Sequence, residues 1–91
     1  MREFEWDEKK RLENIAAPGL DFLDAELFFD APYVTKSTRS GNDRERWLAT
    51  GTMNGAYVTT VFTPRGEVTR IISMRSAQRE ERRRYREVLG G

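Results

Sequence analysis

The 91-residue chain contains no cysteine and no histidine. Without cysteine there is no disulfide framework and no thiolate chemistry, and without histidine the commonest zinc ligand and general base are missing. No GxGxxG or GxxxxGK[ST] glycine loop occurs either, so the usual nucleotide-phosphate cradles are absent. The sequence therefore predicts neither a metal site nor a cofactor.

Long apolar runs are also lacking. No run approaches the ~20 apolar residues of a membrane span, and the N-terminal stretch MREFEWDEKK is acidic rather than a hydrophobic signal region. A cytoplasmic protein without a membrane partner is expected. The length fits a single domain over residues 1–91, so an active site would occupy a shallow surface groove.

The net charge of +1 conceals two oppositely charged halves. Residues 1–45 carry seven Lys or Arg and eleven Asp or Glu, a net charge of −4, whereas residues 46–91 carry nine Arg and four Glu, a net charge of +5. This asymmetry favours nucleic acid or an acidic partner for the C-terminal half. Arginine binds phosphate through a planar fork, although a genome rich in G and C would also raise the arginine content.

Apolar spacing and chain breakers predict an α+β fold with two N-terminal helices and one C-terminal helix. Residues 4–6 alternate like a short strand. A helix over about 8–17 has Leu12, Ile15 and Ala16 on one side, and a second short helix covers FLDAELFF. The closing helix, over about 77–89, has Glu81, Tyr85, Val88 and Leu89 along one stripe.

The central part of the chain predicts an antiparallel sheet of three to five strands. RWLATGTM and AYVTTVFT flank Asn54-Gly55, the signal of a hairpin with a type I′ turn. Pro64-Arg65-Gly66 turns the chain again into EVTRIISM, which completes a three-stranded meander. Residues 33–38 add an edge strand, followed by the polar loop SGNDRE.

Alternation along these strands sorts the side chains into two faces. One face is expected to pack against the helices, and it carries Trp47, Ala49, Val58, Phe62, Val68, Ile72 and Met74. The other is expected to be open and rich in hydroxyls, with Ile71 on it and an arginine at each end, Arg46 and Arg75. Strict alternation puts Arg70 on the helix side, whereas a β-bulge would move it across.

Arg46 and Arg75 are the candidates for phosphate contact, with Tyr57 and Tyr85 nearby. Cleaving RNA without metal or histidine requires a base for the 2′-hydroxyl, positive charge at the phosphate and an acid for the leaving oxygen. Arginines supply the charge, and Glu67 or a tyrosine could move the proton. The competing structural interpretation is an ion pair of Arg46 with Glu67, worth ~0.2–1 kcal/mol, with both tyrosines packing on the sheet.

The run Arg82 to Arg84 has a simpler interpretation. Glutamates at positions 80, 81 and 87 lie three or four residues from these arginines, so the helix pairs its own charges. We interpret this run as a solvated face that steers acidic partners.

Several short motifs of the sequence, taken together, resemble those of the BrnT toxin family. They are FEWDEKK at 4–10, Asn14, Gly19, FLDAELFFD, Arg46, TPRG at 63–66, and RIISMRSA at 70–77 followed by EERRRY. The resemblance covers Phe4 to Tyr85. It implies a RelE-like fold and a ribonuclease toxin of a bacterial type II toxin–antitoxin module. The implied partners are substrate RNA and a BrnA-like antitoxin, in a 2:2 complex that binds operator DNA.

The resemblance also assigns site residues. It points to Arg46 and Arg75 as catalytic, and to Arg65 and Arg70 as RNA-phosphate contacts, to which we add Arg79 at the start of the closing helix. Where the family usually has Lys-His-Gly after the first helix, this chain has Ala17-Pro18-Gly19.

This departure leaves two functional hypotheses open. One is a metal-independent endoribonuclease toxin. The other is a catalytically inactive homologue that still binds an antitoxin and aids repression. A third, a stand-alone nucleic-acid binder, is disfavoured because the acidic N-terminal half weakens attraction to DNA.

Overall fold

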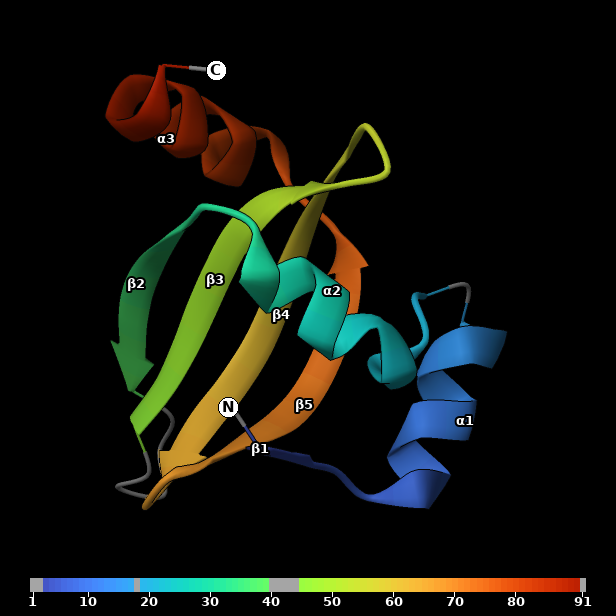
Figure 1. Cartoon of the computed structure of the whole chain (residues 1–91). Coiled ribbons are helices and arrows are strands. Elements are labelled where there is room, and N and C mark those ends of the chain that lie inside the picture. The colour runs from blue at the N-terminus through green and yellow to red at the C-terminus, as the bar shows by residue number, and fades with distance from the viewer. Residues whose placement is uncertain (1–2, 18, 40–44, 91) are drawn as a thin grey trace.

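The computed structural model describes residues 3–17, 19–39 and 45–90, which form one sheet and three α-helices. The strands are β1 (Glu3–Glu5), β2 (Tyr33–Arg39), β3 (Glu45–Met53), β4 (Ala56–Arg65) and β5 (Val68–Ser76). The helices are α1 (Glu8–Ala16), α2 (Ala25–Asp30), which follows the 3₁₀ turn η1 (Phe22–Asp24), and α3 (Arg79–Leu89) (Figure 1). None of these helices is long and apolar enough to cross a bilayer. Pro18 and most of the expected polar loop, residues 40–44, lie outside the described residues.

The sheet is mixed, with the strand order β1-β5-β4-β3-β2. Strands β2 to β5 are antiparallel neighbours, but β1 pairs in parallel with β5. The expectation of an antiparallel sheet is therefore wrong for β1. This strand pairs with a segment from the other end of the chain, and local sequence patterns do not encode the direction of such a pairing.

The β3–β4 turn adopts the type I′ conformation that its Asn-Gly sequence favours. Asn54 and Gly55 have φ angles of 53° and 81°. A type I′ turn needs positive φ at both central positions, so the Asn-Gly prediction is confirmed. The turn sets the register in which Met53 lies opposite Ala56.

A β-bulge in β5 changes which side chains face the core. Val61 lies opposite Ser73, whereas the next residue, Phe62, lies opposite Ile71, so Ile72 is an extra residue in β5. Because side chains alternate with a period of two, the residues before the bulge exchange faces. The expected placement of Val68, Ile71 and Ile72 is therefore wrong: Ile71 is in the core. The bulge also moves Arg70 away from the helix side expected from strict alternation, because it now lies opposite Thr63.

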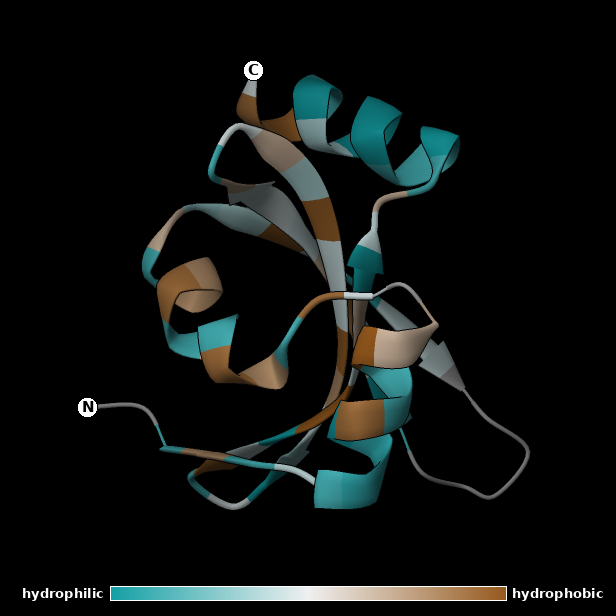
Figure 2. Cartoon of the chain, turned by 90° about the vertical axis from the view of Figure 1, so that its right-hand side faces the viewer, coloured by the Kyte–Doolittle hydropathy of each residue, from teal (hydrophilic) through white to brown (hydrophobic). Residues whose placement is uncertain are grey.

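Helices cover both faces of the sheet (Figures 1 and 2). On one face, η1 and α2 enclose the main core, whose buried members are Phe22, Ala25, Phe28, Phe29, Ala49, Met53, Val58, Ile71 and Met74. Helix α3 lies on the opposite face, across β2 and β3. The expectation that this second face is fully open is therefore wrong, because Tyr85 of α3 packs edge-to-face against Tyr57 of the sheet.

The second N-terminal segment is irregular. The stretch expected as one helix over 22–29 consists of η1 followed by the six-residue α2. Asp21 accepts a hydrogen bond from the Leu23 N–H, 3.0 Å away, and so caps the 3₁₀ turn. Phe28 and Phe29 then enter an aromatic cluster with Tyr33, which anchors the segment to the sheet.

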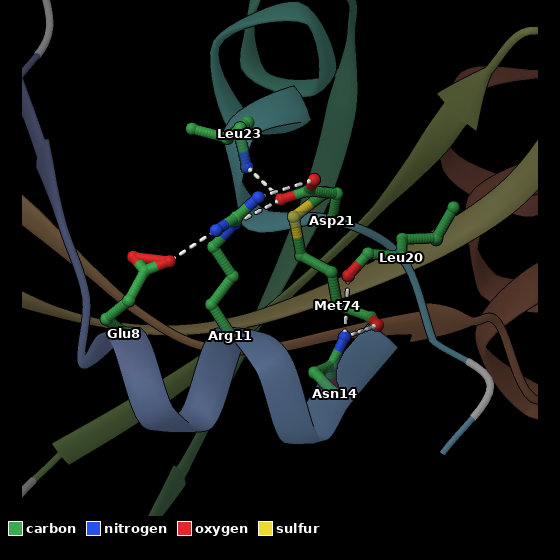
Figure 3. Close-up of polar contacts among 7 residues, drawn as sticks. All are labelled: Glu8, Arg11, Asn14, Leu20, Asp21, Leu23 and Met74. Carbon is green, nitrogen blue, oxygen red and sulfur yellow. Dashed lines mark hydrogen bonds and ion pairs between the residues drawn. The ribbon is translucent and has the colours of Figure 1, made fainter. Parts of the chain in front are cut away.

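Helix α1 docks through polar side chains, as Figure 3 shows. Arg11 donates two hydrogen bonds to Asp21, at 2.7 and 3.0 Å, and also contacts Glu8. Asn14 donates to the carbonyl oxygens of Leu20 and Met74, each at 2.7 Å. No residue of α1 is fully buried, and its apolar side faces outward.

We predict that Thr60→Val stabilises the protein. The Thr60 hydroxyl is fully buried and has no hydrogen-bond partner among the residues that the structure describes. Replacing it with a methyl group of similar size therefore removes an uncompensated desolvation cost. The free energy of unfolding in urea should rise by about 1 kcal/mol. The same change at the half-buried Thr52 controls for strand propensity and should have little effect; equal gains at both sites would contradict the explanation.

We predict that Asn14→Ala loosens α1. The Leu20 and Met74 carbonyls would lose their side-chain donor, at a cost of about 2 kcal/mol in the free energy of unfolding. Glu13→Ala, at the exposed neighbouring position, is the matched control. Hydrogen exchange should accelerate across α1 in the Asn14 variant only, and unchanged protection there would refute the docking role.

Candidate functional site

The candidate site lies on the sheet face that carries α3. We call it the arginine face and define it by the strand residues Arg46, Leu48, Val61, Thr63, Arg65, Arg70, Ser73 and Arg75. Helix α3 covers the end near Thr50 and Thr59 and leaves the other end uncovered by any described helix. The arginine face thus has an open end and a helix-covered end.

The open end brings together Arg46, Thr63 and Arg70. Thr63 lies opposite Arg70, and Arg46 lies opposite Thr63, one step beyond the Trp47–Phe62 pair. With neighbouring strands ~4.8 Å apart, the Cα atoms of the two arginines are roughly 10 Å apart. The Thr63 hydroxyl between them donates to the Glu45 carbonyl oxygen at 2.8 Å, so the phosphate contacts would come from the arginines. Two cations at that spacing can bind a phosphate group.

Arg65 joins this end through Glu5 of β1. One oxygen of the Glu5 carboxylate accepts hydrogen bonds from Arg70 at 2.9 Å and from Arg65 at 3.2 Å. The Arg70 hydrogen bond is the main reason that the pKa of Glu5 lies below its usual value, with Arg65 adding to the effect. Glu5 thus pairs with two of the three arginines at this end, and the Glu45 carboxylate lines the same region. Counting Arg46, Arg65 and Arg70 against Glu5 and Glu45, the open end keeps a net charge of +1. A hollow of about 350 Å³ beside Thr63 and Arg65 gives access to it.

The covered end is electrically neutral. Arg75 donates two parallel hydrogen bonds to Glu81 of α3, at 2.8 and 2.9 Å. The same carboxylate accepts the Thr59 hydroxyl at 2.9 Å and the Gln78 N–H at 2.7 Å. Burial alone would raise the pKa of Glu81, but the hydrogen bonds from Arg75, Gln78 and Thr59 outweigh it and lower the pKa to about 2. Glu81 therefore stays ionised and holds Arg75 in one orientation.

The structure does not bring Arg46 and Arg75 to one point. They are two strands and four residue steps apart, so their Cα atoms are separated by roughly 16 Å. Each of them instead has a different neighbour: Arg46 has Arg70, and Arg75 has Glu81. The two arginines can contact one RNA chain, but at different positions along it.

The remaining predicted residues lie around this face. Tyr57 packs against Tyr85 with ring centroids 5.5 Å apart, and Tyr85 is buried. Glu67 is exposed in the β4–β5 turn and has no ion pair with Arg46 among the described residues. Arg79 is the exposed first residue of α3.

A groove of about 450 Å³ runs between α3 and the outer strands β2 and β3. Arg84 crosses it and donates to the carbonyl oxygen of Thr35 at 2.7 Å. Both charge signs line the groove, through Lys36, Glu80, Arg83, Arg84 and Glu87, together with Val34, Leu48 and Val88. It is a second possible contact area, less cationic than the open end.

Sequence reasoning missed Glu81 and Glu5 as parts of the site. For Glu81 a signal existed, because a carboxylate on the same helix stripe as Tyr85 must find a partner when that stripe packs on the sheet. For Glu5 there was none, since its meeting with Arg65 and Arg70 depends on the parallel pairing of β1 with β5.

Comparison with known families gives one match. Residues 6–81 match a family described as ribonuclease toxin, BrnT, of type II toxin–antitoxin system. The matched range contains every strand residue of the arginine face and ends at Glu81. No curated protein matches the chain significantly.

We predict that Glu81→Gln destabilises the protein in a pH-dependent way. The pKa of Glu81 falls from 4.5 in the unfolded chain to about 2 in the fold. Its contribution, about 2 kcal/mol, is therefore present above pH 4.5 and is lost as the pH falls towards 2. Urea unfolding should show the difference from wild type shrinking over that range. Glu80→Gln, at an exposed position of the same helix, should be nearly neutral at every pH; a difference for Glu81→Gln that stayed constant down to pH 2 would refute the assignment.

Proposed function

Because the chain belongs to the BrnT family of type II toxin–antitoxin ribonuclease toxins, we propose that it is an endoribonuclease that arrests growth by cleaving RNA. The observation that carries this proposal is the row of Arg46, Thr63 and Arg70 at the open end of the arginine face. A cationic row on an uncovered sheet surface suits an extended polyanion better than a small substrate.

The reaction would be transesterification by the RNA itself. A base removes the 2′-hydroxyl proton, the 2′-oxygen attacks phosphorus, and the 5′-oxygen leaves with a proton. Arginines at the phosphate stabilise the charge that develops on it. We assign that role to Arg46, with Arg70 facing it across Thr63. Arg75, also catalytic in the family pattern, lies roughly 16 Å away and pairs with Glu81, so it would contact the same RNA at another position, as would Arg65 and Arg79.

For proton transfer the candidates are Tyr57 and Glu67. Tyr85 is also a candidate from its sequence position, but its burial against Tyr57 favours a packing role. Glu81 is a positioning residue instead, because four donors occupy its carboxylate. We propose that no metal takes part, since the chain has neither histidine nor cysteine and the described residues contain no group of three or more carboxylates placed to hold one.

A toxin of a type II system has an antitoxin partner. We propose a BrnA-like antitoxin that covers Arg46 or Arg75 and, by dimerising, forms a 2:2 complex that binds operator DNA. The toxin itself would be one cytoplasmic domain over residues 1–91 with a RelE-like fold.

A second candidate is an inactive homologue that binds the antitoxin and aids repression. Two observations favour it: Ala17-Pro18-Gly19 stands where the family has Lys-His-Gly, and Arg75 is neutralised by Glu81. This candidate predicts complex formation without RNA cleavage.

The test is RNA cleavage by the purified chain, with and without EDTA. Arg46→Ala and Arg70→Ala should each lower kcat/KM by about 10²-fold, while Arg82→Ala, on the exposed face of α3, should leave it within about twofold. EDTA should leave the rate of RNA cleavage unchanged. Cleavage by folded Arg46→Ala and Arg70→Ala at the wild-type rate would overturn the site, and a wild-type protein that binds antitoxin but leaves RNA intact would favour the second candidate.

A further inference from the structure

Helix α1 turns its apolar stripe away from the protein. Leu12 is 57% exposed and Ile15 40% exposed, whereas Arg11 and Asn14 make the docking contacts. At 3.6 residues per turn, Ile15 lies ~40° and Leu12 ~100° around the helix from Arg11, which faces η1. The stripe is therefore on the outward side of α1 that adjoins η1.

A second pair of apolar side chains extends this surface. Leu23 of η1 is 59% exposed and Leu27 of α2 is 53% exposed. The Arg11–Asp21 ion pair and the Asp21–Leu23 hydrogen bond hold α1 beside η1 (Figure 3). We call Leu12, Ile15, Leu23 and Leu27 the leucine patch. Four large, outward-facing aliphatic side chains on adjoining helices are typical of a protein contact surface.

The rim of the leucine patch is acidic. Residues 20–32 contain four carboxylates and no lysine or arginine. Arg11 neutralises Asp21, which leaves Asp24, Glu26 and Asp30 exposed around Leu23 and Leu27. On α1 the nearest charges, Glu8 and Lys9, balance each other. The patch therefore offers apolar contacts inside a rim with a net charge of about −3.

We propose that the leucine patch binds an amphipathic helix whose apolar side is flanked by Lys or Arg, supplied by the antitoxin of the module. The choice of partner rests on the proposed function; the chemistry of the helix follows from the patch and its rim. This contact lies among the N-terminal helices, and α2 lies on the sheet face opposite α3 (Figure 1). It anchors the antitoxin, while inhibition depends on covering the arginines.

Other occupants fit less well. RNA would be repelled by the acidic rim. A membrane surface attracts amphipathic helices with basic polar faces, and this rim has the opposite charge. A second copy could pair its own leucine patch with this one, but the two acidic rims would then repel each other. Its basic α3, with Val88 and Leu89, could make only a head-to-tail contact, which does not close into a two-fold dimer.

The test measures binding of the purified neighbouring-gene antitoxin to the full chain. The double variant Leu23→Lys/Leu27→Lys should raise Kd by at least about tenfold and leave RNA cleavage by the free toxin unchanged. The matched control is Val88→Lys/Leu89→Lys, which places the same charges on exposed apolar residues of α3. Neutralising the rim by Asp24→Asn/Glu26→Gln/Asp30→Asn should slow association and flatten its dependence on salt.

Each outcome bears on a different claim. If the antitoxin binds the wild type and the patch variant equally, the anchoring surface is refuted. If rim neutralisation leaves the association rate unchanged or raises it, the basic character of the helix is refuted. If the neighbouring-gene product does not bind the wild type at all, the proposed partner fails. Concentration-dependent oligomers of the wild type alone that the patch variant abolishes would assign the patch to a second copy instead.

Discussion

One extra residue in β5 determines both the core and the site. Side chains on a strand alternate between faces, so inserting Ile72 exchanges the faces of all residues before it. Ile71 thereby enters the core beside Phe62, and Arg70 joins Arg46 on the opposite face. Without the bulge, a charged side chain would point towards the aromatic cluster and the open end would lose one of its two facing arginines. The packing of the core and the proposed phosphate site thus depend on the same local irregularity.

Electrostatics then divides the arginine face into two functional environments. At the open end Glu5 pairs with Arg65 and Arg70, and Arg46 has no ion pair among the described residues, so positive charge remains in excess. At the covered end Arg75 and Glu81 cancel each other, and the extra donors Thr59 and Gln78 fix the carboxylate in place. The first arrangement favours an anionic ligand, such as the RNA that we propose as substrate, whereas the second aligns one guanidinium and holds α3 on the sheet.

The N-terminal helices combine a polar attachment with an apolar exterior. Arg11 and Asn14 supply directional hydrogen bonds to the loop before η1 and to β5, and these bonds fix α1 even though it buries no residue fully. Its aliphatic side chains therefore remain available for a partner. The two oppositely charged halves of the sequence form different surfaces: the acidic half surrounds the leucine patch, and the basic half forms the arginine face.

The sequence alone determined whatever depends on neighbouring residues. The Asn54-Gly55 turn needs positive φ, the hairpin strands follow from the period-two pattern, and α1 follows from its cap and its spacing. Arg46 and Arg75 lie on one face as expected, although the bulge lies between them along the chain, because the expected alternation holds through β3 and β4 and again from Ser73 onward. Tertiary structure decided the rest. The parallel pairing of β1, the bulge at Ile72, the side on which α3 docks and the pairing of Glu5 with Arg65 and Arg70 depend on contacts between separate elements. Their free energies come from contacts that form only when the whole sheet is assembled, so a local pattern carries no record of them.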